Sequence, residues 1–206
     1  DTSHGSVTAD RIVVCPGDNY AGPLADIYQD AGLSHCTLQM LRVDAGQSEA
    51  INCGLMSDLS LVRYEGYAEL PAAKALLAQL QQEKSEQLSR GIHLIAVRSA
   101  DGSLVVGDSH QDGQTPIPFS DEYTDELIMN ELRECLDLPN ARVVSRWTGS
   151  YARLADHIYH VSRPQPHVRS LIVTGGTGAS TGLALGEDVL ADLEGEIVMD
   201  NKGTEP

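Results

Sequence analysis

The residues best suited to chemistry form a glycine-rich turn at positions 174–181. An apolar run at 171–173 precedes the turn and apolar positions at helical spacing follow it, so this stretch predicts strand, turn and helix. Glycines let the backbone approach a bound group closely, and the free N–H groups of a helix's first turn favour a phosphate or another electron-rich atom. The turn is therefore a candidate cofactor or anion site. The alternative is a tight connection in which the glycines only relieve backbone strain.

A second polar stretch, G-D-S-H-Q-D-G at 107–113, places Asp108 and Asp112 close to His110. Carboxylates and imidazoles bind metal ions and move protons. However, the spacing of this one histidine and two aspartates does not match a known set of three metal ligands. From the sequence we therefore predict no metal site.

Composition narrows the classes of partner. The 206 residues carry a net charge of −16, with 30 acidic against 14 basic residues and no lysine or arginine run, which argues against binding nucleic acid or an anionic membrane surface. No apolar run reaches the roughly 20 residues of a membrane span, so a cytoplasmic protein is expected. The four cysteines, at positions 15, 36, 53 and 135, show no metal or disulfide spacing and are expected to be free thiols.

The elements that would position these residues follow from hydrophobic periodicity and turn signals. Strands are expected at 10–15, 34–43, 92–97, 104–106, 141–151 and 157–161, with further short strands within 44–68. Helices are expected at 22–32, 71–90 and 121–136, and Asp101-Gly102 predicts a hairpin turn. The prolines at 164 and 166 predict a loop, and residues 195–206 a loose tail.

Three segments resemble, in order, the family of FAD-dependent D-amino-acid, glycine and sarcosine oxidases. They are T-A-D-R-I-V-V-C-P-G (8–17), V-V-S-R-W-T-G (143–149) and V-T-G-G-T-G-A-S-T-G-L-A-L-G (173–186). Together with C-T-L-Q-M-L-R (36–42) and G-D-S-H (107–110), they look closest to a branch associated with aminophosphonate breakdown.

The resemblance implies an α/β plus α+β fold: a partial FAD-binding, Rossmann-like domain with an inserted antiparallel-sheet substrate domain. The expected boundaries are 1–33 for the first FAD-domain segment, 34–163 for the substrate domain, and 164–206 for the returning strand, turn, helix and tail. Family members begin with a strand and a G-x-G-x-x-G turn for the ADP part of FAD. This chain lacks that opening, so we expect it to be the C-terminal part of a longer oxidoreductase.

The resemblance also assigns candidate site residues. Flavin contacts are expected from Gly17, Gly175, Gly176, Thr177, Gly178, Ala179, Ser180 and Thr181. Where many relatives carry W-A-G-L-R-P with a carboxylate-binding arginine, this chain has W-T-G-S-Y-A, with Tyr151 in the arginine's place. A different anion, such as a phosphonate, could be bound by Arg42, His110, Arg146 and Tyr151, although for each arginine alone a surface charge is the favoured explanation. No catalytic side chain is assigned, because a flavin carries the hydride step itself.

The resulting hypothesis is oxidation of a C–N bond in a small amine, of amino-acid or aminophosphonate type, by hydride transfer to non-covalent FAD with oxygen as acceptor. FAD binding is expected to need the missing N-terminal part, so the isolated chain should bind FAD weakly and be inactive. The alternative is a non-catalytic acidic domain that binds a basic partner.

Overall fold

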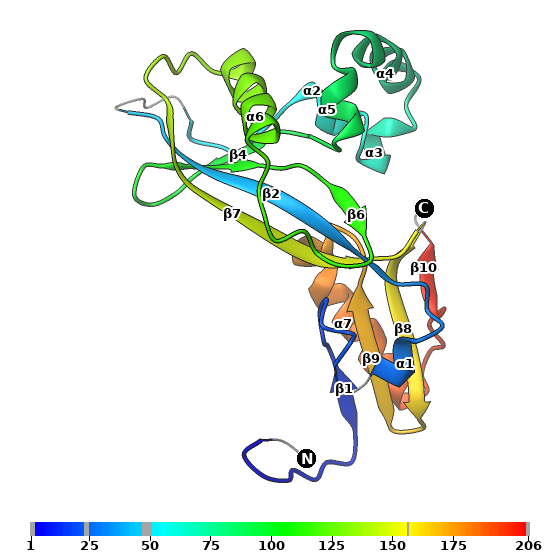
Figure 1. Cartoon of the computed structure of the whole chain (residues 1–206). Helices are drawn as coiled ribbons and strands as arrows, with labels where there is room; N and C mark the ends of the chain where they lie inside the picture. Colours follow the sequence, from blue (N-terminus) through cyan, green and yellow to red (C-terminus); the bar gives the residue numbers. More distant parts are fainter. Residues whose placement is uncertain (1–2, 23–24, 47–50, 156, 205–206) are drawn as a thin grey trace. The chain divides into compact units, whose positions relative to one another are not determined.

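The computed structural model describes residues 3–22, 25–46, 51–155 and 157–204. The chain divides into two compact units, one comprising residues 1–35 and 151–206 and the other residues 36–150. Each unit has its own sheet (Figure 1). The predicted class, α/β plus α+β with an antiparallel sheet inserted between two outer segments, is confirmed.

The first unit contains a four-stranded sheet in the order β1 (Ile12–Val14), β9 (Val168–Val173), β8 (His157–Gln165), β10 (Lys202–Thr204). β1 runs parallel to β9, with Ile12 opposite Val168 and Val14 opposite Ser170, and the other pairs are antiparallel. Its helices are the short α1 (Ala25–Tyr28) and the long α7 (Gly178–Glu194). The helix predicted at 22–32 is shorter and ends at Tyr28, and residues 23–24 of the predicted helix lie outside the described residues.

Three expectations for this unit were wrong. Pro164 lies inside β8, and Gln165 pairs with Val168, so a tight turn replaces the predicted loop. β8, which we placed in the inserted segment, pairs with β9 in the sheet of the first unit. The tail is also ordered as far as residue 204, because Met199 is buried against Val161 and Val189 and β10 pairs with β8.

A buried ion cluster fastens α7 to the sheet. The carboxylate of Asp192, 2% exposed, accepts hydrogen bonds from Arg163 of β8, from Arg169 of β9 and, at 2.9 Å, from the main-chain N–H of Met199. The guanidinium of Arg169 also donates to the main-chain carbonyl of Asp192 at 3.0 Å. These contacts fix the helix whose first turn follows the glycines.

The second unit contains a six-stranded sheet. Its order is β3 (Leu55–Met56), β4 (Ile95–Arg98), β5 (Leu104–Gly107), β2 (Ser34–Asp44), β6 (Gln111–Gly113), and β7 (Arg142–Arg153) also pairs with β2. β4 and β5 form the predicted antiparallel hairpin, in which Gly102 adopts a φ of +85° that suits glycine at the turn.

Helices cover this sheet more than the sequence suggested. Of the short strands expected within 44–68, the described residues contain β3 (Leu55–Met56), whereas residues 57–68 contain α2 (Asp58–Leu61) and α3 (Glu65–Ala68). Residues 47–50 lie outside the described part of the chain. The predicted helix at 71–90 divides into α4 (Pro71–Glu83) and α5 (Ser85–Ser89) at Lys84. The predicted α6 (Glu122–Cys135) is confirmed and begins at Asp121, whose side chain caps the main-chain N–H groups of Tyr123 and Thr124.

The core of the second unit lies between α6 and the sheet. Leu41 and Val43 of β2 point to the same face, and they pack with Leu127, Ile128 and Leu132 of α6 in one buried cluster. The even-numbered residues of β2, which include Arg42, therefore face the other side of the sheet.

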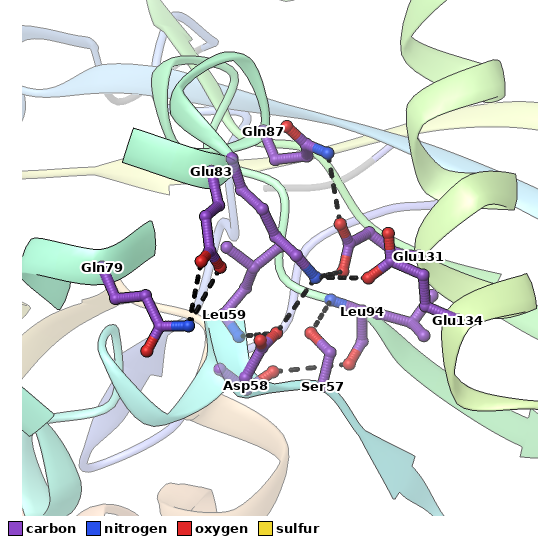
Figure 2. Close-up of polar contacts among 11 residues, drawn as sticks. Ser57, Asp58, Leu59, Gln79, Glu83, Gln87, Leu94, Glu131 and Glu134 are labelled. Carbon is purple, nitrogen blue, oxygen red and sulfur yellow. Dashed lines mark hydrogen bonds and ion pairs between the residues drawn. The ribbon is translucent and has the colours of Figure 1, made fainter. Parts of the chain in front are cut away.

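A second ion cluster joins α5 to α6. The side chain of Glu131 is fully buried, and its Oε2 lies 2.9 Å from the Nζ of Lys84. The same ammonium lies 2.7 Å from Glu134 and 3.5 Å from Asp58, and Gln87 donates to Glu131 Oε1 at 3.2 Å (Figure 2). The break between α4 and α5 thus falls at the residue that supplies the cation.

Among the described residues, none of the helices combines the length and the apolar character that crossing a bilayer requires.

Candidate functional site

The predicted strand, glycine turn and helix are confirmed as β9, residues 174–177 and α7. Thr174 fixes the start of the turn: its N–H donates to Ile158 O at 2.9 Å and its hydroxyl to His157 O at 2.7 Å. The carbonyl of Thr177 accepts the N–H groups of Ser180 and Thr181 at 3.0 and 3.1 Å, which starts the helix. The turn is therefore held by β8 at one end and by the first hydrogen bonds of α7 at the other.

The protein's own packing explains only one of the three glycines at positions 175, 176 and 178. A Cβ on Gly178 would lie 3.0 Å from the Cγ1 of Val173, so glycine is needed there for close packing. Gly175 and Gly176 are not in the left-handed region, and a Cβ on Gly176 would meet no described atom within 4 Å. Relief of backbone strain therefore does not explain the glycine at position 176. Because glycine has no side chain, the space above the backbone stays open at this position.

The beginning of α7 is suited to an electron-rich group. The first N–H groups of any helix lack intrahelical acceptors, and the described side chains provide no cap at Thr177. No acidic residue lies in the first turn, and Gly176, Ala179 and Ser180 are exposed. The positive end of the dipole of this 17-residue helix is thus open to a ligand.

Gly17 lies at the same end of the sheet. β1 and β9 are parallel neighbours, so the loop after β1, which contains Gly17, and the glycine turn after β9 both follow carboxyl ends of strands. Ligands of open α/β sheets bind at that edge. Gly17 has a φ of +65°, which explains the glycine without a ligand.

The two predicted substrate arginines do not converge. Arg42 pairs with Asp101 at 2.9 Å and with the Ser103 hydroxyl at 3.0 Å, on the face of β2 away from α6. Arg146 pairs with Asp125 of α6, on the opposite face of the sheet. Tyr151 belongs to the stretch of β7 in the first unit and is half-buried.

His110 lies in a compact cluster with Asp108 and with His93, a residue that the sequence analysis did not single out. The His93 and His110 rings stack with centroids 4.5 Å apart, and Asp108 lies between their Nε2 atoms. His93 sits in an apolar run that we assigned wholly to a strand. Counting back from the Asp-Gly turn places His93 within one residue of Asp108 across the hairpin, which is the signal that could have identified it.

No protein-family model matches the chain, and no curated protein matches it in sequence. Its fold resembles solved structures of glycine oxidase from Bacillus cereus ATCC 14579 (13% identity, TM-score 0.60) and from Geobacillus kaustophilus (12%, 0.63). In both cases the match covers 97% of this chain and 46% of the other. L-proline dehydrogenase from P. horikoshii is also similar (13%, 0.59; 87% and 41% covered). The chain spans less than half the length of these structures. The chain therefore shares its fold with part of these glycine oxidase and L-proline dehydrogenase structures.

Proposed function

We propose that this chain is part of an FAD-dependent oxidoreductase that oxidises a C–N bond of a small amine. The observation that carries the proposal is the turn at residues 174–177, where Gly176 is required neither by φ nor by packing and opens onto the uncapped start of α7. The fold shared with glycine oxidase and L-proline dehydrogenase supports it, as does the resemblance of three sequence segments to FAD-dependent oxidases.

In this proposal, residues 175–181 and Gly17 hold non-covalent FAD from the carboxyl end of β1 and β9. When bound, the flavin supplies the hydride acceptor. The N–H groups at the start of α7 then face an electron-rich atom and stabilise negative charge there. Residues 1–35 and 151–206 would form the FAD-binding domain and residues 36–150 the substrate domain.

The surface of the first unit agrees with a longer FAD domain. Ile12 and Val13 of the edge strand β1 are 42% and 38% exposed, and Leu183 and Leu190, one face of α7, are 91% and 55% exposed. Exposed apolar residues on neighbouring elements are typical of surfaces that another part of a protein covers. We therefore expect FAD to need further residues of a longer protein and to bind this chain alone weakly.

For the substrate, we propose an amine of amino-acid or aminophosphonate type, with oxygen as the acceptor. Arg42 and Arg146 already have carboxylate partners, so either would have to exchange that partner for a substrate anion. His110 and Tyr151 would bind the substrate as hydrogen-bonding groups.

Gly176→Val is expected to leave folding intact and to weaken FAD binding at least about tenfold, because its side chain would fill the space over the turn without meeting a described protein atom. The experiment uses the full-length parent protein and measures flavin content and FAD affinity by fluorescence titration. Gly66→Val is the matched control, since its Cβ also meets no described atom. Equal FAD affinity in both variants would contradict the placement of the flavin.

The function itself is tested separately by purifying the parent protein. We expect a yellow protein whose flavin bleaches with an amine substrate in the absence of oxygen. A folded, colourless parent that binds no FAD would reject the proposal and leave the acidic binding domain, with its net charge of −16, as the explanation.

A further inference from the structure

Two imidazoles and one carboxylate converge in the second unit, and nothing in the flavin proposal requires all three. The Nε2 of His93 lies 3.6 Å from one oxygen of Asp108, and the Nε2 of His110 lies 3.8 Å from the other. One potential ligand atom from each residue lies within 4.8 Å of the others. The three side chains are 4%, 17% and 9% exposed, so the cluster is buried.

This cluster leaves polar atoms unsatisfied. Both ring nitrogens of His93 and the Oδ1 of Asp108 are buried without a hydrogen-bond partner among the described residues. Native proteins pair more than about nine in ten buried polar groups, because an unpaired group retains the cost of its lost hydration. Two of these atoms, His93 Nε2 and Asp108 Oδ1, lie 3.6 Å apart, which indicates that a further group belongs beside them.

The hydrogen bond between His110 and Gly91 fixes the tautomer of the His110 ring. Its Nδ1 lies 3.0 Å from the carbonyl oxygen of Gly91, and a carbonyl only accepts, so Nδ1 carries the proton. The lone pair is then on Nε2, which points to Asp108. Histidines that bind metals almost always donate their other ring N–H in this way, to a carbonyl or a carboxylate.

Main-chain hydrogen bonds hold the three positions in place. The N–H of His93 donates to Asp108 O at 3.2 Å and the N–H of Asp108 to His93 O at 3.3 Å, while the N–H of His110 donates to Arg90 O at 3.0 Å. Gly91 adopts a φ of +60°, and a Cβ there would lie 2.8 Å from the Cβ of His110. Main-chain hydrogen bonds thus position all three residues, and the glycine at position 91 allows the close approach of His110.

The charges around the cluster leave a place for a cation. Among the described residues, the ion pairs of Asp108 are with His93 and His110, and no lysine or arginine lies within ion-pair distance of its carboxylate. A metal ion would supply a positive charge beside this buried carboxylate.

We propose that His93, Asp108 and His110 bind a divalent transition-metal ion, Zn²⁺ being the best match. Tetrahedral zinc with bonds of about 2.0–2.2 Å holds its ligand atoms about 3.4 Å apart. The two Nε2 atoms lie 3.6 and 3.8 Å from different oxygens of Asp108, and one ligand atom from each residue lies within 4.8 Å of the others, so binding requires the three side chains to move slightly inward. Two nitrogens and one carboxylate oxygen also leave a position open for water or a substrate oxygen, as in catalytic zinc sites.

Arg63 provides a sharp test of the charge argument. Its positive charge acts on both His93 and Asp108 and lowers the pKa of each. The same charge would repel a metal ion. Arg63→Gln is therefore expected to tighten metal binding, whereas loss of a ligand should weaken it.

The experiment strips the purified protein with a chelator and titrates it with Zn²⁺ by calorimetry, and with Co²⁺ by visible absorption. We expect one tightly bound ion per chain, a tetrahedral Co²⁺ spectrum and a raised melting temperature. His110→Ala and Asp108→Asn should lose at least about tenfold in affinity, and His167→Ala, an exposed histidine, should lose none.

Circular dichroism of each variant separates loss of a ligand from loss of folding. His93→Gln gives a second, less disruptive test of the buried ligand if His110→Ala does not fold. Absence of Zn²⁺ and Co²⁺ binding by the folded wild type, or equal affinity in the ligand variants, would overturn the metal site. Neither readout involves flavin, so the result is independent of the proposed oxidoreductase activity.

Discussion

Asp192→Ala is expected to destabilise the first unit by about 3–5 kcal/mol, the usual result of removing one partner from a buried ion cluster. Arg169 is 8% exposed and would keep its charge without its carboxylate partner, while Arg163 and the N–H of Met199 would each lose an acceptor. Urea unfolding of the variant and the wild type measures the difference.

Asp188→Ala is the matched control, because Asp188 is exposed on the same helix, and its effect should stay within about 0.5 kcal/mol. A cost below about 1 kcal/mol for Asp192→Ala would mean that water replaces the carboxylate and that the cluster is not what holds α7.

The same carboxylate should make the first unit sensitive to acid. Hydrogen bonds from Arg163 and Arg169 outweigh burial and hold the pKa of Asp192 well below its usual range. The folded state therefore binds this proton more weakly than the unfolded chain, whose aspartate pKa is about 3.9. The stabilisation is fully present above about pH 5 and falls as the pH drops below about 4. Asp192→Asn should lose this part of the acid dependence in unfolding curves measured from pH 7 to pH 3.

Lys84→Met is expected to cost the second unit about 3–5 kcal/mol, because Glu131 would stay fully buried without its cation and, among the described residues, would keep the hydrogen bond from Gln87. Burial already raises the pKa of Glu131, so the unpaired carboxylate would be costly whether it stays charged or takes up a proton. Burial alone would lower the pKa of Lys84. Its hydrogen bonds to Glu134 and Glu131 raise the pKa by more than burial lowers it, so the net change is an increase. The ammonium thus stays charged at neutral pH and Glu131 depends on it.

The double variant Lys84→Met/Glu131→Leu should recover most of this loss, since exchanging a buried ion pair for apolar side chains is often neutral. Lys74→Met, an exposed lysine on α4, is the control and should change stability by less than about 0.5 kcal/mol. If the double variant is as unstable as Lys84→Met alone, the cost lies in packing and not in the unpaired carboxylate.

Long periodic segments could be predicted from the sequence. α6 shows apolar positions at helical spacing and an Asp cap, and β4 and β5 flank an Asp-Gly turn, so local residues determine both. The glycine turn between β9 and α7 was predictable for the same reason.

What could not be predicted depends on contacts distant in sequence. α2 and α3 have four residues each, too few for a period of 3.6 to show. The break between α4 and α5 falls within a continuous apolar pattern. It occurs at Lys84, whose ammonium pairs with Glu131 of the distant helix α6. β10 forms by pairing with β8, and β10 itself is only three residues long.

The candidate site likewise has a part that could be predicted from the sequence and a part that could not. The glycine turn is a local motif, whereas the cluster of His93, Asp108 and His110 arises because two strands and the loop after them meet. The two arginines are uninformative by themselves, because nothing in the sequence indicates that Asp101 and Asp125 are their partners.

The parallel pairing of β1 with β9 also sets the order in which the molecule can be assembled. Ile12 pairs with Val168, 156 positions later (168 − 12), and the whole second unit lies between them in the chain. The loop-closure entropy of so distant a contact is large, and parallel pairings of this kind form slowly. During synthesis, residues 36–150 can fold while the first strand still waits for its partner. The apolar edge of β1 is therefore exposed until the last fifth of this chain is synthesised, and this is the interval in which aggregation is most to be expected.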